Sequence, residues 1–315
     1  MSKKTSYLLG ILFTIIIGTL LYCYFCDECH CFPSGDTDTT TKITSDNEVV
    51  KEPDVKVTSL NPFTIKDDNG DLGFTIQDNF NFNSSRFKYL DSVSANVDSG
   101  VAKIKDYLEA NNSKRLDIIG HYTSGETNNS AYPNLGLARA NSVKNYFVSK
   151  GVDSKYINTS GKLDDALVAD ANNVFRGPVS YNISTIAEGD SAANDALKAK
   201  CDAIKAAPLV LYFKTGQASI NLTAEQRQKI ADMSNCVDKL GMKIQVIGHT
   251  DNTGNAANNM TLGQNRADFA KRYLVRNGIL GANIEASSQG PNKPIASNAT
   301  DEGRAKNRRT VVTIN

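Results

Sequence analysis

The sequence predicts an α/β fold, an α+β sandwich of two tandem βαβαβ units with mixed sheets, preceded by an N-terminal transmembrane helix. Runs of β-branched residues alternate with segments whose apolar residues recur at helical spacing. One such arrangement occurs twice along the chain, and residues 7–25 form an apolar run without a charged side chain. The 315 residues carry a net charge of +1, a balance that gives no indication of nucleic-acid binding.

The repeated arrangement consists of a strand, a polar loop and an amphipathic helix. Residues 115–151 read R-L-D-I-I-G-H, an Asn-rich loop, N-L-G-L-A-R-A-N-S-V-K-N-Y-F and a closing Gly. Residues 244–278 read I-Q-V-I-G-H, a similar loop, T-L-G-Q-N-R-A-D-F-A-K-R-Y-L and a closing Gly. A helix with apolar positions between 90 and 108 precedes the first copy. A helix over 224–240, which the capping box of Thr223 and Gln226 is expected to begin, precedes the second copy. We therefore expect two similar units, the first repeat (71–186) and the second repeat (187–315).

The second repeat ends in a stretch that contains the charged residues most suited to bind a ligand. V-I-G-H-T-D-N-T-G describes a strand that stops at a turn, which places Asp251 at the carboxyl end of that strand. Arg266 follows fifteen residues later, in the first turns of the next helix, and the strand 311–314 is added to a mostly parallel pair of βα units. A carboxylate and a guanidinium that face one pocket either pair with each other or hold the opposite charges of a zwitterion.

Several motifs in this stretch occur in the order typical of a known family. G-H-T-D-x-x-G, an Asn at position 259, L-x-x-x-R and the final T-x-x-G-R-x-x-N-R-R resemble the peptidoglycan-binding domain named after outer-membrane protein A (OmpA). The resemblance covers roughly residues 209–315. It implies that Asp251 and Arg266 grip the diaminopimelate of a cell-wall stem peptide, with Asn259 and Arg308 in support. Further supporting positions, of which the last is expected to be mainly structural, are Thr250, His249 and Arg304.

The first repeat differs from the second at these positions. Arg139 matches Arg266, but the place of Asp251 falls among Thr123 and Ser124, which carry no charge. An ammonium group would be buried there without a partner, which is unfavourable. We therefore expect the first repeat to keep the fold, to bind the wall ligand weakly or not at all, and to serve as a spacer or a protein-protein surface.

Two of the three histidines, His121 and His249, occupy matching positions in the two repeats. This pattern admits a catalytic or metal-binding role, but it favours a loop histidine that shapes the turn, because no Cys, Asp or Glu accompanies both. No motif of a hydrolase, a metalloprotease or a phosphate-binding loop occurs. The sequence thus predicts no enzyme, no cofactor and no metal.

Residues 7–25 are long enough to span a bilayer, and Lys3 and Lys4 before them place the N-terminus in the cytoplasm. A cleaved signal peptide is the alternative, but no small-x-small cleavage site follows the run. Gly10, Thr14 and Gly18 form a stripe of small residues that suits a homo-oligomer, or that arises by chance. The span contains no carboxylate, which disfavours a proton-conducting stator subunit.

The six cysteines fall into two groups. Cys201 and Cys236 lie on predicted helices of the second repeat, where they form a disulfide or remain buried thiols. The others crowd the outer membrane interface, where disulfides are favoured over a metal site because no folded scaffold separates ligand pairs. These are Cys23, Cys26, Cys29 and Cys31.

The expected organisation is an anchor with the cysteine cluster (1–31), a flexible linker (32–70) and the two repeats. The leading hypothesis is a non-catalytic protein of a Gram-negative cell envelope, held in the inner membrane, whose periplasmic second repeat binds peptidoglycan. One alternative is a structural subunit of an envelope-spanning machine that uses the wall contact as a mount. Another is a cell-wall hydrolase.

Overall fold

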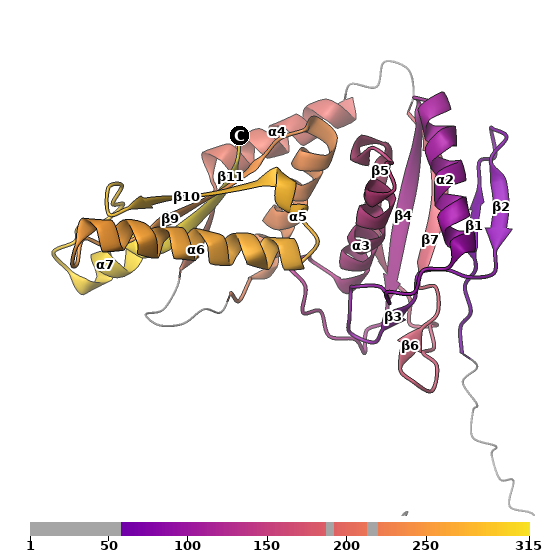
Figure 1. Ribbon diagram of the computed structural model, residues 1–315, viewed down its shortest axis with the longest axis horizontal. Coiled ribbons are helices and arrows are strands. Elements are labelled where there is room, and N and C mark those ends of the chain that lie inside the picture. The colour runs from indigo at the N-terminus through magenta and orange to yellow at the C-terminus, as the bar shows by residue number, and fades with distance from the viewer. Residues whose placement is uncertain (1–57, 187–191, 213–219) are drawn as a thin grey trace, which may run out of the picture. The chain divides into compact units, whose positions relative to one another are not determined.

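The computed structural model describes residues 58–186, 192–212 and 220–315 (Figure 1). They belong to one compact unit, Val55–Asn315. None of the helices in these ranges has the length and apolar character that a membrane crossing requires. The predicted transmembrane run and the cysteine cluster lie outside the described residues.

The first repeat is built on a three-stranded sheet in the order β5-β4-β7 (Figure 1). Its central strand is parallel to β5 and antiparallel to β7. Helix α3 packs on β4 and β5, and a core of apolar side chains from both helices and the sheet fills the interior. The elements are α2 (Ala95–Ala110), β4 (Lys114–Tyr122), α3 (Leu135–Ser149), a short 3-10 helix (Ser154–Tyr156), β5 (Ile157–Leu163) and β7 (Val179–Thr185).

A β-hairpin crosses the boundary that was predicted at residue 70 between the linker and the first repeat. Strands β1 (Phe63–Lys66) and β2 (Gly73–Ile76) pair antiparallel, and Phe63 and Ile65 are buried in the core. The alternation of Phe, Thr, Ile and Lys is the pattern of a strand with one buried face. The linker range predicted from composition therefore extended too far. A second small pairing joins β3 (Phe82–Asn83) to β6 (Val174–Phe175).

The second repeat has a four-stranded sheet in the order β10-β9-β11-β8. Strands β9 (Ile244–His249) and β10 (Ile284–Gly290) are parallel, whereas β11 (Arg309–Ile314) runs antiparallel to both β9 and β8 (Leu209–Tyr212). The sheet is mixed, as expected. The added C-terminal strand is central rather than peripheral, so the parallel pair is one of three pairings.

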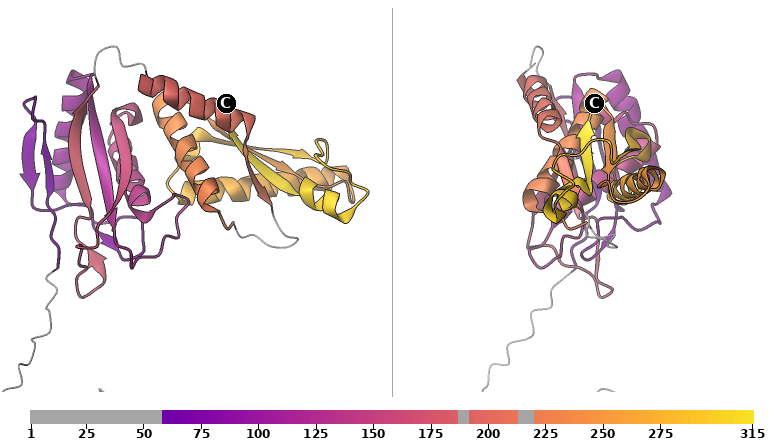
Figure 2. Two further views of the ribbon diagram at one scale, coloured as in Figure 1. Left: turned by 180° about the vertical axis from the view of Figure 1, so that it is seen from behind. Right: turned by 90° about the vertical axis from the view of Figure 1, so that its left-hand side faces the viewer.

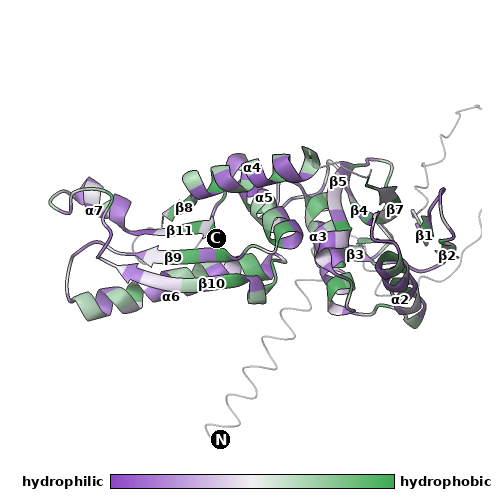
Figure 3. Cartoon of the chain, turned by 90° about the horizontal axis from the view of Figure 1, so that it is seen from above, coloured by the Kyte–Doolittle hydropathy of each residue, from purple (hydrophilic) through white to green (hydrophobic). Residues whose placement is uncertain are grey.

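The helices of the second repeat begin and end at recognisable signals. Helix α5 (Ala224–Leu240) starts with the predicted capping box of Thr223 and Gln226. Helix α6 (Ala256–Arg276) runs beside β9 and β10, and hydrophobic and hydrophilic residues alternate along it (Figures 2 and 3). It begins five residues before the predicted T-L-G segment, because Asn255 caps it by accepting from two backbone N–H groups.

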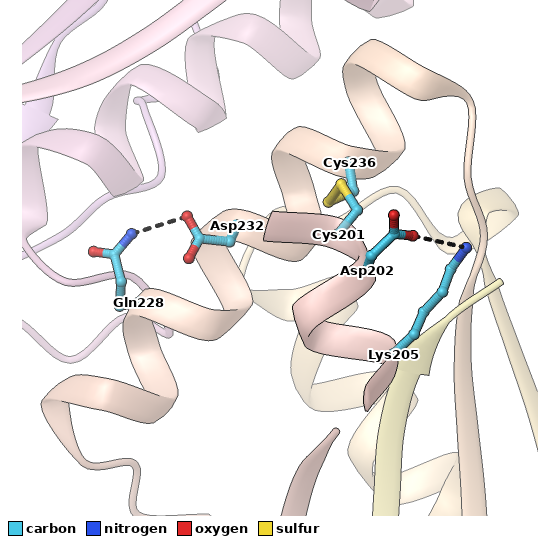
Figure 4. The surroundings of a disulfide bond; sticks show 6 residues. All are labelled: Cys201, Asp202, Lys205, Gln228, Asp232 and Cys236. Carbon is cyan, nitrogen blue, oxygen red and sulfur yellow. Dashed lines mark hydrogen bonds and ion pairs between the residues drawn. A yellow bond between two sulfur atoms is a disulfide. The ribbon is translucent and has the colours of Figure 1, made fainter. Parts of the chain in front are cut away.

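A disulfide joins the lead-in helix α4 (Ala192–Ala206) to α5 (Figure 4). Cys201 and Cys236 are both fully buried, and their Cα atoms are 6.0 Å apart. This distance lies within the ordinary range for bridged cysteines. The bond therefore fastens α4, which contributes few other apolar side chains, to the hydrophobic core of the second repeat.

Candidate ligand-binding site

Asp251 lies two residues beyond the carboxyl end of β9, where the chain turns towards α6. One carboxylate oxygen accepts a hydrogen bond from the backbone N–H of Thr253 at 3.0 Å. The other accepts from Nη1 of Arg308 at 2.8 Å. Only 12% of the Asp251 side chain is exposed. Since a carboxylate offers about four acceptor positions, these two bonds leave acceptor capacity for a ligand donor.

The final motif of the chain places Arg308 opposite Asp251. Helix α7 (Asp301–Asn307) starts at Thr300, whose hydroxyl accepts from the N–H of Gly303. A Cβ at Gly303 would lie 1.8 Å from the carbonyl oxygen of Ser297, so only glycine fits. The fully buried amide of Asn307 then binds the 295–298 loop through both its oxygen and its nitrogen. Arg308 follows as the residue that ends the helix.

Arg304 and Arg309 hold the surrounding loops. Arg304 donates to the carbonyl oxygen of Asn298 at 2.7 Å and pairs with Asp301. Arg309 donates to the carbonyl oxygen of Lys293 at 3.0 Å. Of the three arginines in the motif, Arg308 alone contacts Asp251 among the described residues.

Arg266 lies in the middle of α6 rather than in its first turns, and it reaches back to the end of β9. Its Nη1 donates to the carbonyl oxygen of His249 at 2.9 Å. Helix and strand approach closely here, since a Cβ at Gly248 would lie 1.8 Å from the carbonyl oxygen of Gly263. Asn259 lies about two turns earlier on α6 and donates to the carbonyl oxygen of Thr253 at 3.0 Å, which fixes the Asp251 turn.

The charges of the site favour an anionic group. Burial raises the pKa of Asp251, but the hydrogen bonds from Arg308 and Thr253 outweigh it, so the pKa is lowered and the carboxylate is ionised at neutral pH. Burial lowers the pKa of Arg266, opposed by Asp251 and aided by Arg308. Arginine nevertheless stays charged. Two guanidinium groups and one carboxylate leave one net positive charge.

Four buried polar atoms near this turn have no hydrogen-bond partner within the described residues. Burial and the neighbouring charge of Arg309 lower the pKa of His249 to about 4, so this ring is neutral at pH 7. Unpartnered buried polar atoms are uncommon, and they call for a specific explanation such as a ligand. The atoms are His249 Nδ1, Thr250 Oγ1, Arg308 Nε and Thr310 Oγ1.

The first repeat holds its matching arginine in the same way. Arg139 Nη1 donates to the carbonyl oxygen of His121 at 2.8 Å, the counterpart of the Arg266 bond to His249. A Cβ at Gly120 would lie 2.0 Å from the carbonyl oxygen of Gly136, so the close approach of strand and helix is repeated too. The two repeats therefore share the frame that positions the arginine.

In the first repeat, however, a carboxylate of the chain itself already forms an ion pair with this arginine. Glu126 accepts from Arg139 Nη2 at 2.5 Å and Nη1 at 3.1 Å. Its oxygens also accept from the backbone N–H groups of Ser85 and Thr123 at 2.9 and 3.0 Å. Arg139 is fully buried, and 2% of the Glu126 side chain is exposed. The guanidinium that would hold a ligand carboxylate is thus satisfied from within.

Glu126 does not align with Asp251 in the sequence. The positions aligned with Asp251 are Thr123 and Ser124, which carry no charge. The missing carboxylate lies two residues further along the loop, across the one-residue insertion, and reaches Arg139 from there. A search for any acidic residue in the whole loop, rather than at the aligned position, would have identified it.

A protein-family model matches this chain in two segments. The model of the OmpA family matches residues 79–174 and 212–308, together more than half of the chain. The chain belongs to the OmpA family. The resemblance inferred from the motifs is confirmed, and the match covers both repeats.

The relatives with curated descriptions include a peptidoglycan-binding protein and a probable lipoprotein. Peptidoglycan-binding protein ArfA of Mycobacterium tuberculosis is 36% identical over 120 residues, 38% of this chain and 36% of ArfA. The probable lipoprotein YiaD of Escherichia coli is 45% identical over 71 residues, 22% of this chain and 32% of YiaD. The matched region thus spans about a third of these relatives.

Among solved structures, the peptidoglycan-associated lipoprotein from Burkholderia pseudomallei is 29% identical with a TM-score of 0.28. It covers 34% of this chain and 89% of its own.

Proposed function

We propose that the second repeat of this protein is a non-catalytic peptidoglycan-binding domain that ties a membrane of the cell envelope to the wall. The observation that carries the proposal is the arrangement of Asp251, Arg266 and Arg308 around the end of β9. The family and the description of ArfA as peptidoglycan-binding support it.

The ligand is the free amino-acid end of diaminopimelate in a stem peptide. Its ammonium group donates to the acceptor positions of Asp251 that Thr253 and Arg308 leave open. Its carboxylate pairs with Arg266 and relieves the net positive charge of the site. Asn259 holds the turn, and the unpartnered Thr250 hydroxyl is a further donor or acceptor for the ligand.

The decisive experiment measures binding of the purified chain to isolated peptidoglycan sacculi. Asp251→Ala and Arg266→Ala should each weaken sedimentation with sacculi at least about 10-fold, because each removes one charge-assisted hydrogen bond of about 1.5–3 kcal/mol. Matched controls remove exposed charges of the same sign from the same repeat, Glu285→Ala and Arg272→Ala. These should leave binding unchanged.

Competition identifies the chemical group that is recognised. A synthetic stem peptide with diaminopimelate should displace sacculi from the protein. The same peptide with lysine in that position keeps the ammonium group but lacks the carboxylate, and it should compete far more weakly. Equal competition by the two peptides would refute the role of Arg266 as the partner of a carboxylate.

The N-terminal residues and the linker have proposed roles that support this contact with the wall. We propose residues 1–31 as a single-pass inner-membrane anchor with the cysteine cluster, whose stripe of Gly10, Thr14 and Gly18 supports a homo-oligomer. The linker then carries residues 71–186 and 187–315 into the periplasm. A urea-resistant membrane fraction that retains the full chain, and loses it when residues 7–25 are deleted, is the expected result.

A further inference from the structure

The first repeat has a cavity on its sheet, separate from the closed pair of Glu126 and Arg139. Its volume is about 410 Å³. Three of its lining residues are His121 at the end of β4, Ser180 at the start of the adjacent strand β7, and Asp164 just after β5. Pro62, Leu167 and Val179 line it as well, together with Asn61.

These three polar residues form a connected set. The Oγ of Ser180 lies 2.8 Å from Nε2 of His121, and the serine is exposed. Oδ2 of Asp164 lies 3.4 Å from Nδ1 of the same ring, an ion-pair distance that lacks hydrogen-bond geometry. Such contacts are commonly loose in ligand-free sites and tighten when a substrate binds. Ser180, His121 and Asp164 thus contact one another as the nucleophile, base and orienting carboxylate of a serine hydrolase triad do.

The ionisation state of the ring suits a base. Burial lowers the pKa of His121, and Lys162 lowers it further, whereas Asp164 raises it. The net direction is downward, so the imidazole is neutral at pH 7 and Nε2 can accept a proton once Nδ1 carries the hydrogen.

The described residues of the second repeat lack this set, although the frame is the same. His249 matches His121, but the strand position that Ser180 takes opposite Ile119 is held by Val311 opposite Ile247. A histidine that only shaped the turn would not need a serine and an aspartate. The set therefore belongs to the first repeat as a feature of its own.

We propose that the first repeat is an esterase site in which Ser180 is the nucleophile, His121 the general base and Asp164 the positioning residue. The cavity, with its apolar lining, takes a short-chain carboxylic ester. As Ser180 Oγ bonds to the carbonyl carbon, its proton passes to His121 Nε2. The side-chain amide of Asn61 gives one hydrogen to the carbonyl oxygen of Arg176 at 3.4 Å, and its second hydrogen can donate to the developing oxyanion. The alcohol leaves with that proton.

Water completes the reaction. His121 takes a proton from a water molecule, the hydroxide attacks the acyl-serine, and the carboxylic acid leaves as the proton returns to Ser180. No redox step or further reactant is needed. This activity concerns the first repeat alone and is independent of wall binding by Asp251 and Arg266, so either proposal can fail without the other.

The experiment uses the full chain, purified in detergent, with p-nitrophenyl acetate as the substrate and a fluorophosphonate as the covalent probe. We expect mass spectrometry to locate the phosphonyl group on Ser180. Ser180→Ala should abolish labelling and lower turnover by about 100-fold or more, and His121→Asn should do the same. Ser184→Ala, on the same strand and the same face, should change neither.

Two further results separate catalysis from a structural role. Asp164→Asn should lower kcat by a larger factor than it changes KM, because the carboxylate acts on the reacting atoms through the ring. Ser180→Ala removes one exposed hydroxyl, so its circular dichroism should equal that of the unchanged protein. Labelling at another serine, absence of labelling, or equal turnover by Ser180→Ala would each overturn the proposal.

Discussion

Replacing Glu126 by Ala tests whether the first repeat has closed its site with a residue of its own. The substitution leaves the guanidinium of Arg139, fully buried, without a countercharge. It also leaves the backbone N–H groups of Ser85 and Thr123 without their acceptor. Removing one member of a buried ion pair costs about 3–5 kcal/mol. We expect a loss of that size in the free energy of unfolding of the first repeat.

Urea denaturation followed by far-UV circular dichroism measures this loss, since the chain has no Trp for fluorescence. Hydrogen exchange of the β4 amides assigns it to the first repeat if the two repeats unfold separately. The matched control is Glu109→Ala, which breaks an exposed pair with Lys105 and should cost no more than about 1 kcal/mol. Equal costs for the two variants would refute the reasoning.

The same variant shows whether the Glu126 side chain stands in for a ligand. If its removal opens a place for a carboxylate, sodium formate should stabilise Glu126→Ala by binding to Arg139 in the folded state. Sodium chloride at the same ionic strength should not, and the two salts should have equal effects on the unsubstituted protein. Identical effects of formate and chloride on the variant would show that the position has collapsed.

Three other predictions concern the second repeat. The pKa of His249 is about 4 in the folded protein and near 6.5 in the unfolded chain, so the unfolded chain binds more protons between these pH values. The free energy of unfolding should therefore fall by up to about 3 kcal/mol as the pH drops from 6.5 to 4. In urea titrations at several pH values, His249→Asn should flatten that dependence. Cys201→Ala with Cys236→Ala opens a loop with a sequence separation of 35 and should lower stability by about 3–4 kcal/mol, a loss absent if the thiols are unpaired in the cell. Gly248→Ala should destabilise the fold because backbone oxygen lies 1.8 Å from the new Cβ, whereas Gly73→Ala, with open space around it, should be tolerated in thermal denaturation.

Patterns local in the sequence predicted the fold well. The period of apolar residues indicated the strand–helix–strand order, and the recurrence of the L-G-x-x-R segment indicated two similar units. The capping box at Thr223 depends on residues three apart and was predicted correctly. The start of α6 was not, because Asn255 and the following alanines were counted as part of a polar loop.

Contacts between distant segments were harder to predict. Nothing in the local pattern says that β11 enters the sheet between β9 and β8 rather than at its edge. That insertion brings Arg308 to Asp251, across 57 residues of sequence, and makes it the direct partner of the carboxylate. The pair of Arg139 and Glu126 was missed for a related reason, because alignment compares positions whereas a loop can deliver the same group from a neighbouring position.

Arg139 and Arg266 are held by the same backbone arrangement in the two repeats, whereas the group that opposes each guanidinium differs. Arg139 and Arg266 each donate a hydrogen bond to the backbone carbonyl of a histidine, His121 near the end of β4 and His249 at the end of β9, beside a glycine that lets the helix approach. That bond fixes the guanidinium whether or not a ligand is present. What differs is the opposing carboxylate: Glu126 supplies it in the first repeat, whereas in the second repeat the proposed ligand would supply it beside Asp251. Selection for binding can therefore act on loop residues alone, while the same frame persists in both repeats and leaves the first sheet available for other chemistry.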